Sequence, residues 1–162
     1  MSQTTKDPLL KAGKIGGLKE RINVHQLNDN AIRHIRSLGD ESGLSTLGIH
    51  LVRLEQGNEL TEFHSHQCDE EFIYILSGSG IAEIGDKEYE IGAGDFMGFC
   101  KNSLAHNMRN PNKEDLVYLM GGNRNEFDIC DYPRINRRMF RVDGAKKYVD
   151  LENLHDVTAN KN

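Results

Sequence analysis

Residues 57–78 read GNELTEFHSHQCDEEFIYILSG and hold the most informative pattern of the chain. His64 and His66 are two residues apart, and side chains at i and i+2 of a β-strand point to the same face. Glu71 follows five residues after His66, so the polar stretch between them must bend the chain if Glu71 is to face the same centre. Glu70 is an alternative to Glu71, because the register across a bend is not set by sequence.

A third imidazole, His106, lies on a later apolar run that reads SLAHNMRN. Three neutral nitrogens and one carboxylate suit a divalent transition metal such as Fe, Mn, Ni, Co or Zn. Four such ligands leave two positions of an octahedral ion open for a small-molecule substrate, water or O₂. No cysteine pair has the spacing of a closed structural zinc site, so the pattern indicates an open, reactive metal.

Short apolar runs surround this segment and are separated by glycine. The chain has 16 glycines and three prolines, a ratio typical of many short strands joined by turns. Runs at this spacing predict an antiparallel sandwich or barrel. Before them, residues 1–20 are expected to form a mobile or loosely docked arm, and Ala31–Leu38 a short helix or turn that ends at Gly39.

The two histidine-containing segments resemble the motifs of the cupin family. The first family motif is matched by Gly57, His64, His66, Glu71 and Gly78, and the second by Gly94, His106 and Asn110. The six residues between Glu71 and Gly78 agree with the family and favour Glu71 over Glu70. In the second motif, Cys100 and Asn102 replace the usual Pro and Gly, and one extra residue precedes His106, which changes turn geometry more than ligand identity.

This resemblance implies an all-β fold, the cupin double-stranded β-helix or jelly-roll barrel. We expect an N-terminal arm over residues 1–43, the barrel over residues 44–121, and a C-terminal extension over residues 122–162 that packs on the barrel or on a partner. The metal ligands implied are His64, His66, Glu71 and His106. Family activities include dioxygenase, isomerase and lyase chemistry, and cupins also serve as non-catalytic binding or sensing modules. A homodimer is expected.

Acid–base candidates besides the ligands are few: Glu70, Tyr118 and Glu62. Strand alternation predicts that Ile73 and Ile75 share the Glu71 face, with the other side chains of that run on the opposite face. Further pocket candidates are Arg53, Met108, Asn110 and Tyr118. The other histidines have no spacing partner and are expected at the surface or in caps: His25, His34, His50 and His155.

The composition limits the kinds of partner and the cellular compartment that we expect. A net charge of −5 over 162 residues argues against nucleic acid as a partner. No apolar stretch is long enough to span a membrane, and no signal peptide is evident, so a cytoplasmic enzyme is expected. Three cysteines without a CxxC motif fit reduced thiols, although Cys68, inside the first motif, is a candidate for a role at the metal.

A basic segment, RINRRMFRV, follows Pro133. We interpret the run from Arg134 to Arg141 as a solvated edge strand, since positive charge discourages pairing between sheet edges. The alternative is contact with an anion or a partner.

Overall fold

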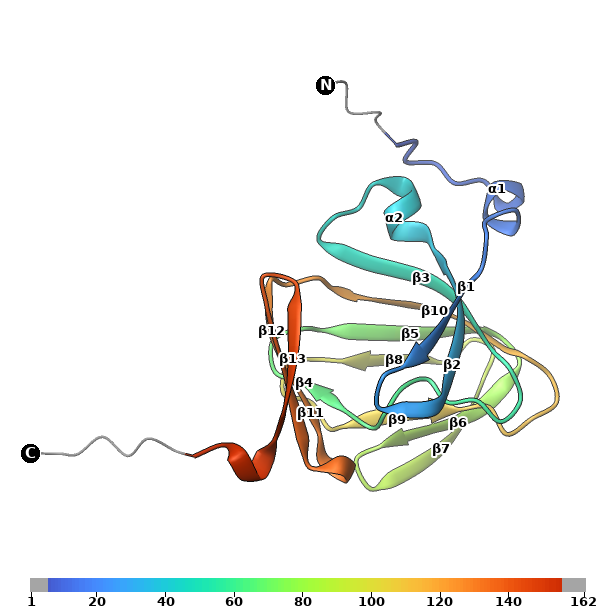
Figure 1. The fold of residues 1–162 in the computed structure, drawn as a ribbon. Coiled ribbons are helices and arrows are strands. Elements are labelled where there is room, and N and C mark those ends of the chain that lie inside the picture. Colours follow the sequence, from blue (N-terminus) through green and yellow to red (C-terminus); the bar gives the residue numbers. More distant parts are fainter. Residues whose placement is uncertain (1–5, 156–162) are drawn as a thin grey trace, which may run out of the picture.

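The computed structural model describes residues 6–155, and β-strands dominate it (Figure 1). Its elements in chain order are α1 (Ala12–Gly16), β1 (Arg21–His25), β2 (Asn28–Ser37), α2 (Leu38–Ser42), β3 (Leu47–Leu54), β4 (Ser65–His66), β5 (Glu71–Ser77), β6 (Ser79–Ile84), β7 (Lys87–Gly92), β8 (Phe96–Phe99), β9 (His106–Arg109), β10 (Leu116–Asn123), β11 (Phe127–Tyr132), η1 (Pro133–Ile135), β12 (Arg137–Val142), β13 (Ala145–Asp150) and η2 (Leu151–Asn153). No helix in this part of the chain has the length and apolar character needed to cross a membrane.

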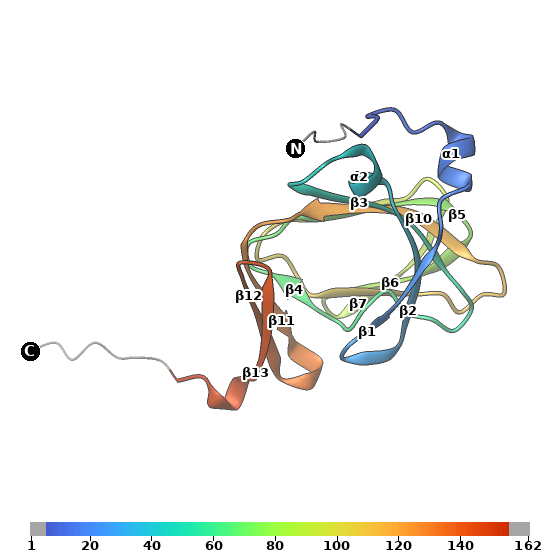
Figure 2. The ribbon, with the colours of Figure 1, turned by 45° about the horizontal axis from the view of Figure 1, so that its top comes forward.

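Three antiparallel sheets enclose the interior. A six-stranded sheet has the order β1-β2-β3-β10-β5-β8, and a three-stranded sheet has the order β7-β6-β9. These two sheets lie opposite each other, and the four-stranded sheet β13-β12-β11-β4 stands across one end of the space between them (Figure 2). The all-β double-stranded β-helix expected from the sequence is confirmed, although hydrogen bonds do not join the sheets into one closed ring.

The core follows the alternation predicted for β5. Ile73 and Ile75 are buried on the inner face, next to Val52 of β3 and Tyr118 of β10. The alternate residues of β5 face outward, and Tyr74 and Leu76 are 40% and 45% exposed. Glu71 shares the inner face, so the same alternation that builds the core also delivers a carboxylate to the interior.

The helix expected at Ala31–Leu38 is wrong. Residues 31–37 belong to β2, which pairs with β1 on one side and with β3 on the other, and Leu38 is the first residue of α2. Hydrogen bonding to two neighbours outweighs the helix-like spacing of the apolar residues in this segment. Within the arm expected at residues 1–20, α1 lies in the described part and residues 1–5 lie outside it.

The basic segment is not an edge strand. Its strand, β12, lies between β11 and β13. Each arginine has an acidic partner instead of facing only solvent: Arg134 pairs with Glu83, Arg137 with Asp150, Arg138 with Asp131, and Arg141 with Asp69. Charge on this strand is therefore neutralised pairwise, which allows a central position in the sheet.

Two turns explain residue choices in the motifs. Gly78 joins β5 to β6 with φ +79°, and a Cβ built on it would lie 2.3 Å from the carbonyl oxygen of Asp115. Asn102 has φ +56°. Asparagine tolerates the left-handed region better than most residues, which is why it can replace the family glycine there.

Candidate metal centre

Four side chains from separate segments converge inside the sheets. His64 forms an isolated bridge with His106 at the start of β9, His66 ends β4, and Glu71 begins β5. The Nε2 atoms of His64, His66 and His106 lie 3.6, 3.6 and 3.5 Å from one atom, Oε2 of Glu71. The structure thus brings together all four residues that the sequence suggested as metal ligands.

These separations suit ligands of a common ion better than hydrogen bonds. A contact of 3.6 Å is too long for a hydrogen bond. Ligands about 2.1 Å from an ion are roughly 3.0–3.6 Å apart at angles of about 90–120°. The ligand atoms of His64, Glu71 and His106 all lie within 4.8 Å of one another, as ligands of one cation must, and Nε2 of His66 approaches the same Glu71 oxygen.

The other ring nitrogen of each histidine faces an oxygen atom. Nδ1 of His64 lies 3.0 Å from the carbonyl oxygen of Glu62, whereas Nδ1 of His106 makes only a long contact of 3.5 Å with that of Leu104. Nδ1 of His66 lies 2.6 Å from Oδ2 of Asp128. A proton donated from Nδ1 leaves the lone pair on Nε2, which is the nitrogen that faces Glu71.

Asp128 is a residue of this centre that the sequence analysis did not identify. It lies on β11, is fully buried, and its Oδ1 accepts the backbone N–H groups of Cys68 and Asp69 at 3.1 and 3.2 Å. The carboxylate is thus fixed at three points and orients the ring of His66. No local motif marks Asp128, because 62 residues separate it from its partner.

The surroundings of Glu71 and Asp128 favour the ionised form of both side chains. Burial alone would raise the pKa of Glu71, but the facing His106, His64 and His66 side chains outweigh it and hold that pKa well below its usual range. Burial would likewise raise the pKa of Asp128, but His66 and two backbone N–H groups lower it. Both side chains are therefore carboxylates near neutral pH.

The histidines differ in their surroundings. Burial lowers the pKa of His64 and favours the neutral imidazole that a metal requires. Burial acts in the same direction on His66, but hydrogen bonding to Asp128 and the charge of Glu71 raise its pKa overall. A metal at this centre would compete with a proton at His66.

Two other groups of ligand-type atoms lie close by, and both are less suitable. Cys130 approaches His64 and His66, but burial raises the pKa of its thiol to about 12, so the thiolate needed for ligation is disfavoured. Asp69 and Asp128 approach His66, but Arg141 and Asn125 bind Asp69. Cys68 contributes its backbone N–H to Asp128, and its side chain is only half-buried.

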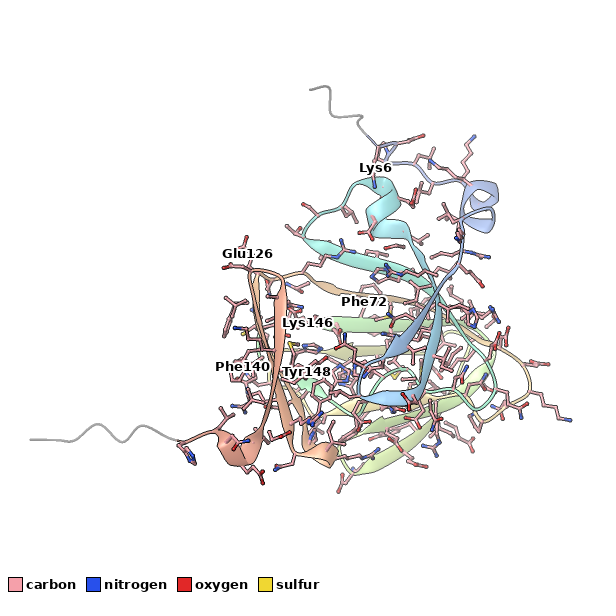
Figure 3. The ribbon with its side chains drawn as sticks, in the orientation of Figure 1. Lys6, Phe72, Glu126, Phe140, Lys146 and Tyr148 are labelled. Atoms are coloured by element: carbon pink, nitrogen blue, oxygen red, sulfur yellow. The ribbon has the colours of Figure 1, made fainter. Side chains whose placement is uncertain are left out.

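A cavity of about 210 Å³ is lined by three of the four residues: His64, His66 and Glu71. The cavity is also lined by basic and aromatic side chains from the N-terminal hairpin (β1 and β2) and from the C-terminal sheet (β11 to β13). These residues are His25, Arg33, Tyr132, Arg141 and Lys146. Lys146 and Tyr148 lie on the side of β13 that faces the interior, and Phe140 lies on the other side of this sheet (Figure 3).

The weaker sequence candidates lie elsewhere. Glu70 is exposed and borders a second groove of about 430 Å³, which shares Glu71 and Phe72 with the cavity. Tyr118 is fully buried in the core, and its hydroxyl has no hydrogen-bond partner. Burial raises the pKa of Glu62, whose backbone carbonyl accepts from His64. None of these three side chains lines the cavity.

The remaining pocket candidates have structural contacts. Arg53 pairs with Glu20, Glu55 and Asp115. The amide of Asn110 donates to the carbonyl oxygens of Leu54 and Glu114, and Met108 packs in the core.

The four histidines outside the proposed ligand set have different contacts. His34 lies near Glu20 and Glu55, His50 bonds to Ser37, and His155 is exposed. His25 accepts a hydrogen bond in its own turn from the N–H of Leu27, as a capping residue would. Its ring also lines the cavity, and burial lowers its pKa to about 4.

Comparison with known proteins agrees with this architecture. The cupin domain family matches residues 50–122. The crystal structure of a proposed sugar phosphate isomerase from Acidithiobacillus ferrooxidans has 39% identity and a TM-score of 0.92, covering 94% of this chain and 98% of that chain. No protein with a curated description matches the sequence.

Two more distant structures share the fold. A sugar phosphate isomerase of the cupin superfamily from Silicibacter pomeroyi has 23% identity and a TM-score of 0.78, covering 94% of this chain and 98% of that chain. A predicted oxalate decarboxylase from Thermotoga maritima has 19% identity and a TM-score of 0.57, covering 67% of this chain and 95% of that chain. Together with the 39% identical relative, these matches show that the chain belongs to the cupin superfamily.

Proposed function

We propose that this protein is a metal-dependent enzyme that isomerises a small hydroxycarbonyl compound. The observation that carries the proposal is the convergence of three Nε2 atoms on Oε2 of Glu71, beside a cavity of about 210 Å³. The isomerase assignment is supported by the relative with 39% identity, which is a proposed sugar phosphate isomerase.

His64, His66, Glu71 and His106 would hold the ion. A divalent metal, such as Fe, Mn, Ni, Co or Zn, would supply Lewis acidity toward a carbonyl or hydroxyl oxygen of the substrate. Asp128 keeps the ring of His66 in the orientation and tautomer that present Nε2. Phe99 stacks on His106 with ring centroids 3.5 Å apart and holds that ring in place.

The cavity supplies hydrogen-bond donors for the rest of the substrate. Nδ1 of His25 accepts from Leu27, so the neutral ring carries its proton on Nε2 and can donate it to a substrate oxygen. The hydroxyl of Tyr132 stays protonated because burial raises its pKa. A cavity of this volume holds roughly seven waters, which limits the substrate to a small molecule.

A second candidate is a non-catalytic binding or sensing module. It is favoured because both carboxylates that line the cavity already have partners. Glu71 faces three imidazoles, and Asp69 is bound by Arg141 and Asn125. Within residues 6–155, the cavity therefore offers no free carboxylate to act as a general base. Proton transfer would depend on a histidine or tyrosine instead.

Proton NMR in D₂O distinguishes these functions. The metal-loaded protein is incubated with aldose and ketose pairs, with and without a phosphate group. An isomerase interconverts at least one pair, and His106→Ala abolishes the conversion while His34→Ala, an outer-face control, does not. A metal-loaded protein that is stabilised by a sugar, but converts none of the panel, would instead be a binding module.

The expected homodimer remains a prediction, and the structure offers a surface on which to test it. Leu47, Tyr74, Leu76 and Phe96 are apolar, lie on the outer side of the six-stranded sheet, and are each at least 40% exposed. Patches of this kind often mark protein interfaces. Light scattering should give twice 18.3 kDa for the wild type and a smaller average mass for Phe96→Ser; a wild-type monomer would contradict the prediction.

A further inference from the structure

Arg33 places an unpaired positive charge in the cavity. It lies on β2 between Ala31 and Ile35, which are 0% and 6% exposed, and this alternation directs its side chain inward. Its Nη2 donates to Asn23 Oδ1 at 2.8 Å, whereas its Nε is buried with no hydrogen-bond partner. No carboxylate of residues 6–155 forms an ion pair with it. A half-buried guanidinium without a counter-charge favours an added anion.

The neighbouring cation Arg141 also has a buried Nε without a hydrogen-bond partner, but it differs from Arg33 because carboxylates lie close to it. Its Nη2 donates to Asp69 at 2.6 Å, and it lies 3.8 Å from Asp128. Glu71, the remaining carboxylate of the cavity lining, faces the three imidazoles. The acidic groups of the cavity are therefore engaged elsewhere, and none of them neutralises Arg33.

Two more donors line the same cavity. His25 carries its proton on Nε2, because Nδ1 accepts the N–H of Leu27 at 3.2 Å. Lys146, on the inward side of β13, has no carboxylate within ion-pair distance among the described residues and is exposed (Figure 3). All three residues lie outside residues 50–122, the part that matches the cupin family.

We propose that Arg33, His25 and Lys146 form an anion subsite that binds the phosphate or carboxylate group of a small ligand. The planar guanidinium can present two parallel N–H donors to two oxygens of such a group. The rest of the ligand would extend toward His66 and Glu71, and only this second half of the inference rests on the proposed function. The N-terminal hairpin and the C-terminal sheet would thus select the ligand, while the cupin core holds the metal.

Calorimetric titration of the full chain tests the subsite. Inorganic phosphate and malonate are the two probes, and each is titrated into metal-loaded protein and into protein stripped of metal by chelation and dialysis. At least one anion should bind the metal-free protein, and the tighter of the two identifies the class of group. Arg33→Met should weaken that binding at least about tenfold, and Lys146→Met should weaken it less because Lys146 is exposed.

Arg36→Met is the matched control, because Arg36 lies on the opposite face of β2 and carries the same charge. It should change anion binding by less than about twofold. Melting curves verify folding, and Arg33→Met should melt no lower than wild type in the absence of anion, since it removes an unpaired, half-buried charge. Glucose 6-phosphate should bind more tightly than glucose if phosphate is the preferred group.

The subsite is refuted if neither anion binds metal-free protein, or if Arg33→Met binds as the wild type does. If anions bind only to the metal-loaded protein, and Arg33→Met binds them as tightly as the wild type, the anion binds to the metal instead. A protein that binds anions through Arg33 but takes up no metal would retain the subsite and refute the proposed enzyme.

Discussion

Replacing Asp128 by Asn tests whether β11 controls the metal centre. The carboxylate accepts from Nδ1 of His66 at 2.6 Å and from two backbone N–H groups through its other oxygen. An asparagine of the same shape can keep its oxygen on the backbone donors, but its NH₂ group then faces Nδ1. The imidazole must accept that hydrogen bond and move its proton to Nε2, the nitrogen that faces Glu71.

The expected cost is a 10–100-fold loss of metal affinity, or about 1.4–2.7 kcal/mol at 25 °C. Competition against a chromophoric chelator measures the affinity for Zn²⁺ or Co²⁺, and circular dichroism verifies the fold. Asp131→Asn is the matched control, because Asp131 lies on the same strand and pairs with Arg138 rather than with a ligand. If Asp128→Asn binds metal as tightly as Asp131→Asn, Asp128 does not orient His66 as described.

Three further predictions concern stability, measured as the free energy of unfolding in urea. Gly78→Ala should cost about 2 kcal/mol more than Gly57→Ala, because both have φ +79° but only Gly78 brings a Cβ against Asp115; equal losses would contradict this. Tyr118→Phe should leave stability unchanged or raise it by about 1–3 kcal/mol, since the buried hydroxyl has no partner, and a loss above about 1 kcal/mol would show a missed hydrogen bond. Burial lowers the pKa of His25 to about 4 from 6.5; the unfolded chain therefore binds the extra proton, and about 2 kcal/mol should be lost by pH 5. His25→Asn should remove this part of the pH dependence, and an unchanged profile would contradict it.

The closeness of His64 and His66 was predictable because it depends on a short-range rule, whereas Glu71 and His106 were assigned through the resemblance to the cupin motifs. Residues two apart share a strand face, which places His64 and His66 together. The same period of two predicted Ile73 and Ile75 on the inner face, where both are buried. Each of these inferences uses neighbours within one strand, and no knowledge of which strands pair is needed.

Features that depend on pairing between distant segments were not predictable. Ala31 and Ile35 have helical spacing, and only the pairing of β2 with β1 and β3 makes residues 31–37 a strand. The contact of Asp128 with His66 spans 62 residues. The inward direction of Arg33 likewise follows from the register of β2, which its own sequence does not fix.

Metal content measured by mass spectrometry tests the proposed centre most directly. Full-length protein is purified without an affinity tag, soaked in a divalent transition metal and desalted. The wild type should retain about one equivalent per chain, and His106→Ala should retain less than about a tenth while remaining folded. A wild-type protein that holds less than about a tenth of an equivalent after soaking would contradict the metal centre.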